Sequence, residues 1–164
     1  MFKPIADAGL EWNPPDYLYY LENTTEEGYR YSGDQVEVRQ ISLNDLSAFE
    51  QMTDACSEED LDAGYVEIDH SIVIGVFLGA KMVCRASAYP FMKSTEIYDI
   101  GYITHPDFKG KGYGSPCCSA LVKEILKQKK VPQIRVQAQI SGSIRVAEKV
   151  RFVKQGECTY DKQD

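Results

Sequence analysis

The pattern of apolar and polar positions predicts three consecutive strands in the middle of the chain. Two apolar, β-branched runs, 71–78 and 81–89, are joined by Gly79-Ala80 and are typical of a β-hairpin. A third apolar run, 96–104, follows after a short connection and predicts the next strand.

Some of the remaining stretches have the apolar periodicity of strands, and others have that of helices. Ser42 and Asp45 predict a capping box ahead of an apolar stripe at helical spacing, and Ser57 begins a second, acidic helical turn. The further elements that the periodicity predicts are strands at 35–41 and 133–139, one or two strands within 152–160, and helices at 116–130 and 143–150. The order βααβββαβαβ indicates an α/β domain with a mixed sheet.

The first 34 residues show no clean period. Pro14-Pro15 and the mixed polarity predict irregular structure, with one helical turn near 16–22. We therefore divide the chain into a lead-in, 1–34, and a core domain, 35–164. The lead-in is interpreted as packing over one edge of the core, and a lid over a substrate or a dimer arm are the alternatives.

Charge is distributed unevenly along the 164 residues, which suffice for one domain with a sizeable core. Residues 1–70 carry a net charge of −14 and residues 71–164 carry +7, for a total of −7. The basic half suits a polyanionic ligand, and the acidic half suits a cationic one. An ordinary charged surface is the alternative, and the overall acidity argues against nucleic acid as the main partner.

The five cysteines are odd in number and form no Cys-x-x-Cys pair, which favours a reducing compartment over a disulfide framework. With His70 and His105 as the two histidines, no zinc or other metal site is expected. The chain has no run of eighteen apolar residues and no charged-then-apolar leader. A cytoplasmic protein without a membrane segment is therefore expected.

Three glycines at alternate positions, Gly110, Gly112 and Gly114, fall between the predicted strand 96–104 and the predicted helix 116–130. Glycine permits left-handed backbone conformations, and the first turn of a helix presents N–H groups that attract an anion. Lys109 and Lys111 add positive charge, and Ser115 is a candidate cap of the helix. The junction therefore predicts a phosphate-binding loop, with a loop that merely turns the chain as the alternative.

The spacing of these glycines matches neither the Walker loop nor the dinucleotide-binding fingerprint. The stretch Lys109-Gly110-Lys111-Gly112-Tyr113-Gly114 resembles the coenzyme A loop of the GNAT N-acetyltransferases, and so does the strand and proline before it. The resemblance implies the GNAT fold with a central, splayed mixed sheet, and acetyl-CoA as the cofactor. The residues that it assigns to coenzyme A are Tyr102, Ile103, Thr104, Lys109, Gly110, Lys111, Gly112, Tyr113, Gly114, Ser115 and Ser143.

The reaction that the resemblance implies is direct attack of a neutral primary amine on the thioester of acetyl-CoA. Such a reaction needs a base and a proton donor. Glu96 and Asp99, beside the expected thioester, are the candidate bases, and solvated charges at a strand end are the alternative. Ala147 stands where the family often has a tyrosine acid, so Tyr113 and Tyr160 are the candidates to replace it.

The resulting hypothesis is an N-acetyltransferase that acts on a small-molecule or protein amine, with a cationic acceptor and a homodimer as open possibilities. An acyl-CoA sensor that has lost turnover is the main alternative, because the usual tyrosine is missing. A nucleotide-binding module is the third reading.

Overall fold

The computed structural model describes residues 15–22, 31, 33, 35–137 and 141–159. Within these residues, seven strands form one sheet in the order β2-β3-β4-β5-β6-β1-β7. The strands are β1 (Asp16–Leu21), β2 (Glu37–Gln40), β3 (Ile72–Leu78), β4 (Lys81–Pro90), β5 (Ile97–Thr104), β6 (Val131–Gln137) and β7 (Phe152–Cys158), and the helices are α1 (Leu46–Ala55), α2 (Glu58–Gly64), α3 (Gly114–Lys127) and α4 (Ser141–Lys149). From β2 onward, the predicted order βααβββαβαβ is confirmed.

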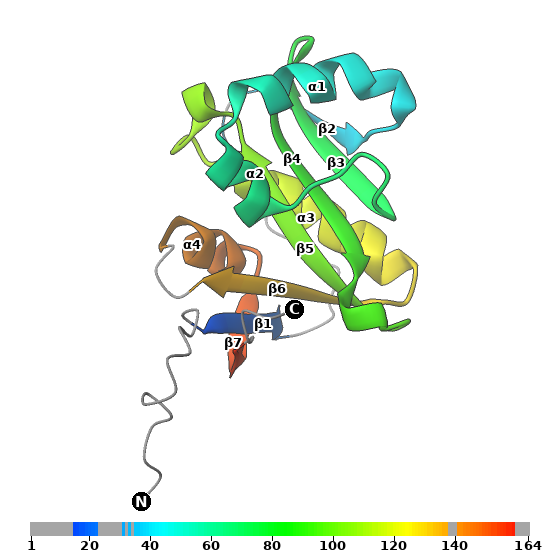
Figure 1. The fold of residues 1–164 in the computed structure, drawn as a ribbon, viewed down its shortest axis with the longest axis vertical. Helices are drawn as coiled ribbons and strands as arrows, with labels where there is room; N and C mark the ends of the chain where they lie inside the picture. Colours follow the sequence, from blue (N-terminus) through cyan, green and yellow to red (C-terminus); the bar gives the residue numbers. More distant parts are fainter. Residues whose placement is uncertain (1–14, 23–30, 32, 34, 138–140, 160–164) are drawn as a thin grey trace, which may run out of the picture.

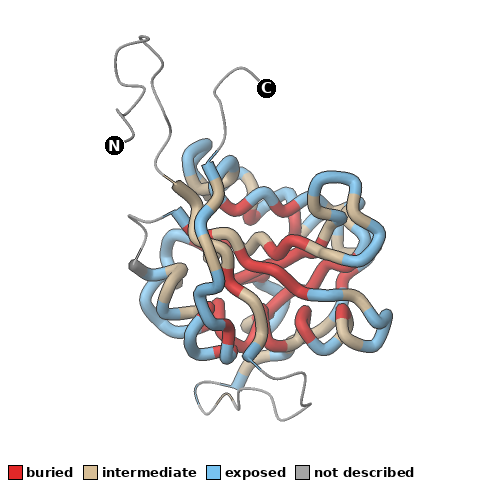
Figure 2. Tube along the Cα trace, turned by 90° about the horizontal axis from the view of Figure 1, so that it is seen from below, coloured by how far each residue is buried: buried red, intermediate tan, exposed pale blue. Residues whose placement is uncertain are grey.

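Helices cover both faces of the sheet, and each face has its own apolar core (Figure 1). On one face, Phe49 and Met52 of α1 pack with residues of β3 and β4. On the other, Cys117, Leu121 and Ile125 of α3 pack with the strands and with α4, as their helical spacing predicted. Figure 2 shows the buried positions gathered along the central strands.

Among the helices of the described residues, none has the length and apolar character that a membrane span requires. The longest of the four named helices, α3, has 14 residues.

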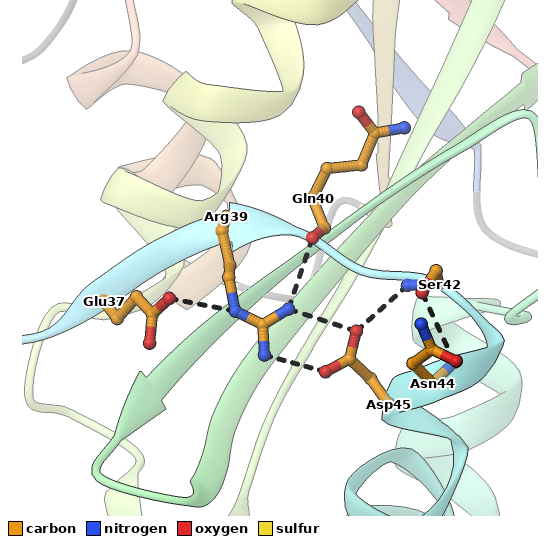
Figure 3. Close-up of polar contacts among 6 residues, drawn as sticks. All are labelled: Glu37, Arg39, Gln40, Ser42, Asn44 and Asp45. Carbon is orange, nitrogen blue, oxygen red and sulfur yellow. Dashed lines mark hydrogen bonds and ion pairs between the residues drawn. The ribbon is translucent and has the colours of Figure 1, made fainter.

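A cluster of polar contacts fixes the connection from β2 to α1 (Figure 3). Arg39 donates to both carboxylate oxygens of Asp45, at 2.7 and 3.1 Å, and its Nε lies 3.0 Å from Glu37. The predicted capping box is present: Ser42 accepts from the N–H of Asn44 in this short turn, and the Asp45 carboxylate accepts from the N–H of Ser42. The hydrogen bonds from Arg39 are the main reason why the pKa of Asp45 is lowered.

Residues 16–21, expected to be irregular with one helical turn, instead form strand β1. β1 lies between β6 and β7 and is antiparallel to both, so it is an interior strand of the sheet. Two strands far along the chain supply its hydrogen-bonding partners, and its tyrosines suit a strand that packs on a core. Within the lead-in, positions 1–14, 23–30, 32 and 34 lie outside the described residues.

The sheet divides between its two parallel strands. The register of β5 with β6 runs from Ile97 opposite Val131 to Ile100 opposite Ile134. Beyond that point β5 continues to Thr104 and β6 to Gln137, and the two strands diverge (Figure 1). The diverging ends leave backbone groups of both strands available to a ligand.

Candidate functional site

A cleft of about 700 Å³ occupies the opening between β5 and β6. Its walls come from α2, from the glycine loop and the start of α3, from α4, and from the first residue of β1. Of the residues predicted to bind coenzyme A, those that line this cleft are Tyr102, Ile103, Thr104, Lys109, Gly110, Gly112, Tyr113, Gly114, Ser115 and Ser143. The structure therefore brings together nearly the whole set that the sequence proposed.

The glycine loop has the backbone of an anion-binding turn. Gly110 and Gly112 have φ angles of +78° and +86°, in the left-handed region that favours glycine. A Cβ at either position would meet no atom within 4 Å, so the loop backbone faces open space. α3 begins at Gly114, and Gly114 and Ser115 line the cleft. The first N–H groups of a helix have no intrahelical acceptors and are available to a ligand.

The predicted capping role of Ser115 is wrong. α3 begins one residue earlier than Ser115, and Tyr113 occupies the N-cap position without a capping bond from its side chain. Ser115 is buried within the first helical turn. An N-cap without a side-chain acceptor leaves the helix terminus suited to an external anion.

The two lysines of the loop have different surroundings. Lys109 Nζ lies 2.6 Å from the carboxylate of Asp60 on α2 and lines the cleft. Lys111 does not line the cleft, and its Nζ lies 5.1 Å from the ring centre of Phe108. The backbone of the loop is therefore better placed than the lysines to contact an anion.

α2 packs directly against the backbone of β5. A Cβ on Gly101 would lie 1.9 Å from the carbonyl oxygen of Gly64, and a Cβ on Gly64 would lie 2.2 Å from the Ile103 side chain. The two glycines permit this close approach, which makes α2 one wall of the cleft.

Tyr102 links β5 to α4 across the cleft. Its hydroxyl donates to Ser143 Oγ at 3.2 Å, and a Cβ on Gly114 would lie 3.0 Å from its ring. Burial raises the pKa of Tyr102, so the phenol stays protonated over the whole physiological range. The cleft thus holds a protonated hydroxyl between the strand and the helix.

The two predicted bases lie in different places. Asp99 is 2% exposed, lines the cleft, and accepts from Tyr89 Oη at 3.2 Å, from Gln133 Nε2 at 3.1 Å and from Arg135 Nε at 2.6 Å. Burial raises the pKa of Asp99, although Arg135 and the hydrogen bonds oppose the shift. Glu96 is exposed just before β5 and does not line the cleft.

Of the two tyrosines proposed to replace the family's acid, the structure describes Tyr113, which lines the cleft. The Tyr113 side chain is buried, and its ring packs near Tyr31 and Phe108. Tyr160 lies outside the described residues. Ala147, at the usual tyrosine position, is buried in the core.

The cleft-lining residues that sequence reasoning missed include Asp16, Tyr65, Tyr89 and Arg135. Asp16 stands at the start of β1, 3.9 Å from Arg135 Nη1. The alternation of Tyr17, Tyr19 and Leu21 was the signal in the sequence for strand β1, which carries Asp16. The apolar residues between these three positions obscure that alternation.

Comparisons with known proteins agree with this geometry. The family model described as GNAT acetyltransferase matches residues 37–160. No curated protein sequence matches the chain.

Three of the similar solved structures share the fold at low sequence identity. A GNAT-family protein from Novosphingobium aromaticivorans has a TM-score of 0.66 at 14% identity, over 96% of this chain and 68% of that one. The protein yncA from Salmonella typhimurium, determined with its cofactor acetyl-CoA, has 0.60 at 17%, over 75% and 82%. AAC(6')-Iy, in complex with the bisubstrate analogue CoA-S-monomethyl-acetylneamine, has 0.60 at 11%, over 80% and 99%. The family match and the shared fold lead to one conclusion: the chain belongs to the GNAT acetyltransferase family.

Proposed function

We propose that this protein is an acetyl-CoA-dependent N-acetyltransferase that transfers an acetyl group to a primary amine. The observation that carries the proposal is the position of the left-handed glycines Gly110 and Gly112. They precede the N-terminus of α3 at the open end of the β5–β6 divergence. An anion site and a strand with free backbone groups thus share one cleft. The first suits the phosphates of a ligand such as coenzyme A, and the second suits the amide groups of its arm.

The residues present fit coenzyme A. The amides from Lys109 to Gly114 would hold the pyrophosphate, and the backbone of Tyr102, Ile103 and Thr104 would hold the pantetheine arm. Ser143, on the facing helix, lies on the same side as the Tyr102 hydroxyl. The acetyl-CoA in the yncA structure and the CoA analogue in the AAC(6')-Iy structure support this assignment by analogy of fold.

The cleft carries side chains of both charges. Arg145 and Lys149 of α4, Asp60 and Asp62 of α2, and Asp16 of β1 all line it. Basic side chains suit the phosphates of coenzyme A, and acidic side chains attract a protonated amine.

Bound acetyl-CoA would supply an acetyl group activated as a thioester, for direct attack by the neutral amine. The protein must then hold the amine, take its proton and provide a proton to the leaving group. Tyr102 is our proposed proton donor, because its protonated hydroxyl lies in the cleft. Ala147, at the position where the family often has a tyrosine, has no hydroxyl group. Asp99 is our proposed positioning residue, because its three hydrogen bonds fix Tyr89 and Arg135.

An acyl-CoA sensor without turnover is the second candidate. The observation in its favour is the buried Ala147, which leaves α4 without the usual tyrosine hydroxyl.

The experiment that separates these functions is release of the coenzyme A thiol from acetyl-CoA, measured with and without a panel of primary amines. An N-acetyltransferase releases thiol faster when an amine is present, and the acetylated amine accumulates in equal amount. Binding of acetyl-CoA without amine-dependent release would instead support the sensor. Binding of ADP as tight as that of coenzyme A would support a nucleotide-binding module.

A further inference from the structure

The insertion of β1 between β6 and β7 brings an additional carboxylate to the cleft. Asp16 pairs in register with Gln137 of β6 and with Cys158 of β7, and it lines the cleft. Its side chain is 20% exposed, so solvent and ligands reach it. A residue 83 positions before Asp99 in the sequence thus joins the same site.

Asp16 and Asp99 differ in how far their oxygens are already used. Asp99 accepts three hydrogen bonds and is almost fully buried. Among the described residues, the ion-pair contact of Asp16 is a long one, 3.9 Å to Arg135 Nη1. The Asp16 carboxylate is therefore more available to a cation than the Asp99 carboxylate, whose oxygens already accept hydrogen bonds from its neighbours.

The groups facing Asp16 have opposing effects on its pKa. Arg135 on β6 favours the charged form, while burial and the Asp99 charge on β5 disfavour it, and burial is the largest cause of its raised pKa. On β7, Cys158 stands opposite. A carboxylate with a raised pKa is a stronger base than an ordinary aspartate.

Two tyrosines provide an apolar wall in the same cleft. Tyr65, the residue after α2, has a φ of +46°, a left-handed conformation that is costly for a non-glycine residue. It is 49% exposed, and its ring centre lies 5.0 Å from that of Tyr89. Tyr89 in turn accepts from Arg135 Nη2 at 3.4 Å, which places it in the same group of contacts as Asp16.

We propose that Asp16 binds the ammonium group of the acceptor and removes its proton, and that the acceptor is a primary amine on a flat, apolar stem that packs on Tyr65 and Tyr89. This inference rests on the proposed function and names its acceptor class. Aromatic rings attract both an apolar stem and an adjacent cation.

The proton transfers balance. Asp16 takes one proton from R–NH₃⁺, which leaves the neutral R–NH₂ with a lone pair for attack, and later returns that proton to solvent. As the N–C bond forms and the C–S bond breaks, the second proton of the nitrogen passes to the thiolate through the proton donor. One ammonium and one thioester are consumed, and one amide, one thiol and one proton are formed.

The test compares wild type with Asp16→Asn and, as the control, Asp54→Asn. Asp54 is an exposed carboxylate of α1 that does not line the cleft. Acetyl-CoA, tyramine and putrescine are each titrated calorimetrically, the amines with and without saturating coenzyme A. Asp16→Asn is expected to bind tyramine at least ~10-fold more weakly, because a charged hydrogen-bonded contact is lost, and to bind acetyl-CoA unchanged. Asp54→Asn is expected to match wild type.

Two further readouts are needed. The pH profile separates a role of Asp16 in catalysis from a role in binding, and the comparison of two amines separates recognition of the apolar stem from recognition of the ammonium group. The acid limb of the kcat/KM profile, which reports the ionised Asp16, should be present in wild type and absent in Asp16→Asn. Tyramine should bind more tightly than putrescine, and Tyr65→Ala should weaken tyramine selectively.

Unchanged tyramine affinity and an unchanged pH profile in Asp16→Asn would overturn the assignment of Asp16 even if wild type acetylates amines. A preference of wild type for putrescine would overturn the acceptor class. Failure of wild type to bind acetyl-CoA would instead contradict the proposed function.

Discussion

The Asp99 carboxylate and the Arg135 guanidinium form an ion pair, with Nε 2.6 Å from Oδ2, at the point where β5 and β6 separate. Asp99 lies opposite Gln133 in the parallel register, whose last pair is Ile100 with Ile134. Arg135 is thus the first residue of β6 beyond that register. The ion pair therefore holds the two strands together at the closed end of the cleft.

Asp99→Ala should lower the free energy of unfolding by about 2–3 kcal/mol, because the donors on Tyr89, Gln133 and Arg135 all lose their acceptor. Asp99→Asn should cost less, since its amide oxygen still accepts. Urea denaturation at neutral pH measures both, with Asp54→Ala as the matched control on the surface. Equal stability of Asp99→Ala and wild type would show that the pair does not hold the strands.

Tyr102→Phe should leave acetyl-CoA affinity unchanged and lower kcat at least ~10-fold, because the hydroxyl proposed to protonate the leaving group is removed while the ring stays. Tyr98→Phe, on the same strand but outside the cleft, is the control and should turn over like wild type. Steady-state kinetics and calorimetry provide the two readouts. A Tyr102→Phe variant with wild-type kcat would remove Tyr102 from the chemistry.

Asp45→Ala should reduce stability by about 1 kcal/mol at neutral pH, because it breaks the capping box and the partly exposed ion pair with Arg39. The pKa of Asp45 is lowered, so its contribution is present above the ordinary value of 3.8 and is lost as pH falls through the lower folded-state value. Chemical denaturation at several pH values should show the difference from wild type narrowing below that ordinary value. A difference that stays constant into acid would contradict the ion pair as its source.

The features that the sequence predicted correctly depend on neighbouring residues. The glycine loop, the strand before it and the helix after it are contiguous, so turn chemistry and periodicity sufficed to place Gly110, Gly112 and Gly114. The capping box at Ser42 is equally local.

The features that it did not predict depend on pairings between distant segments. β1 forms because β6 and β7, more than a hundred residues later, hydrogen-bond to both of its sides. The different surroundings of Glu96 and Asp99 arise from strand pairing. Glu96 is exposed just before β5, whereas Asp99, three positions later, pairs within the sheet at the closed end of the cleft. Asp16 could not be assigned to the cleft from the sequence, because its place there depends on the pairing of β1.

The measurement that tests the central claim most directly is calorimetric titration of acetyl-CoA into wild type, Gly112→Glu and Gly79→Glu. Gly112 and Gly79 both have positive φ, +86° and +59°, and a Cβ on either meets no atom within 4 Å, so both variants carry a similar backbone cost. Gly112→Glu alone places a carboxylate at the proposed pyrophosphate site. Wild type and Gly79→Glu should bind with equal affinity and Gly112→Glu at least ~100-fold more weakly, since it introduces like-charge repulsion and blocks the backbone amides. No binding to wild type, or equal binding to Gly112→Glu, would contradict the account.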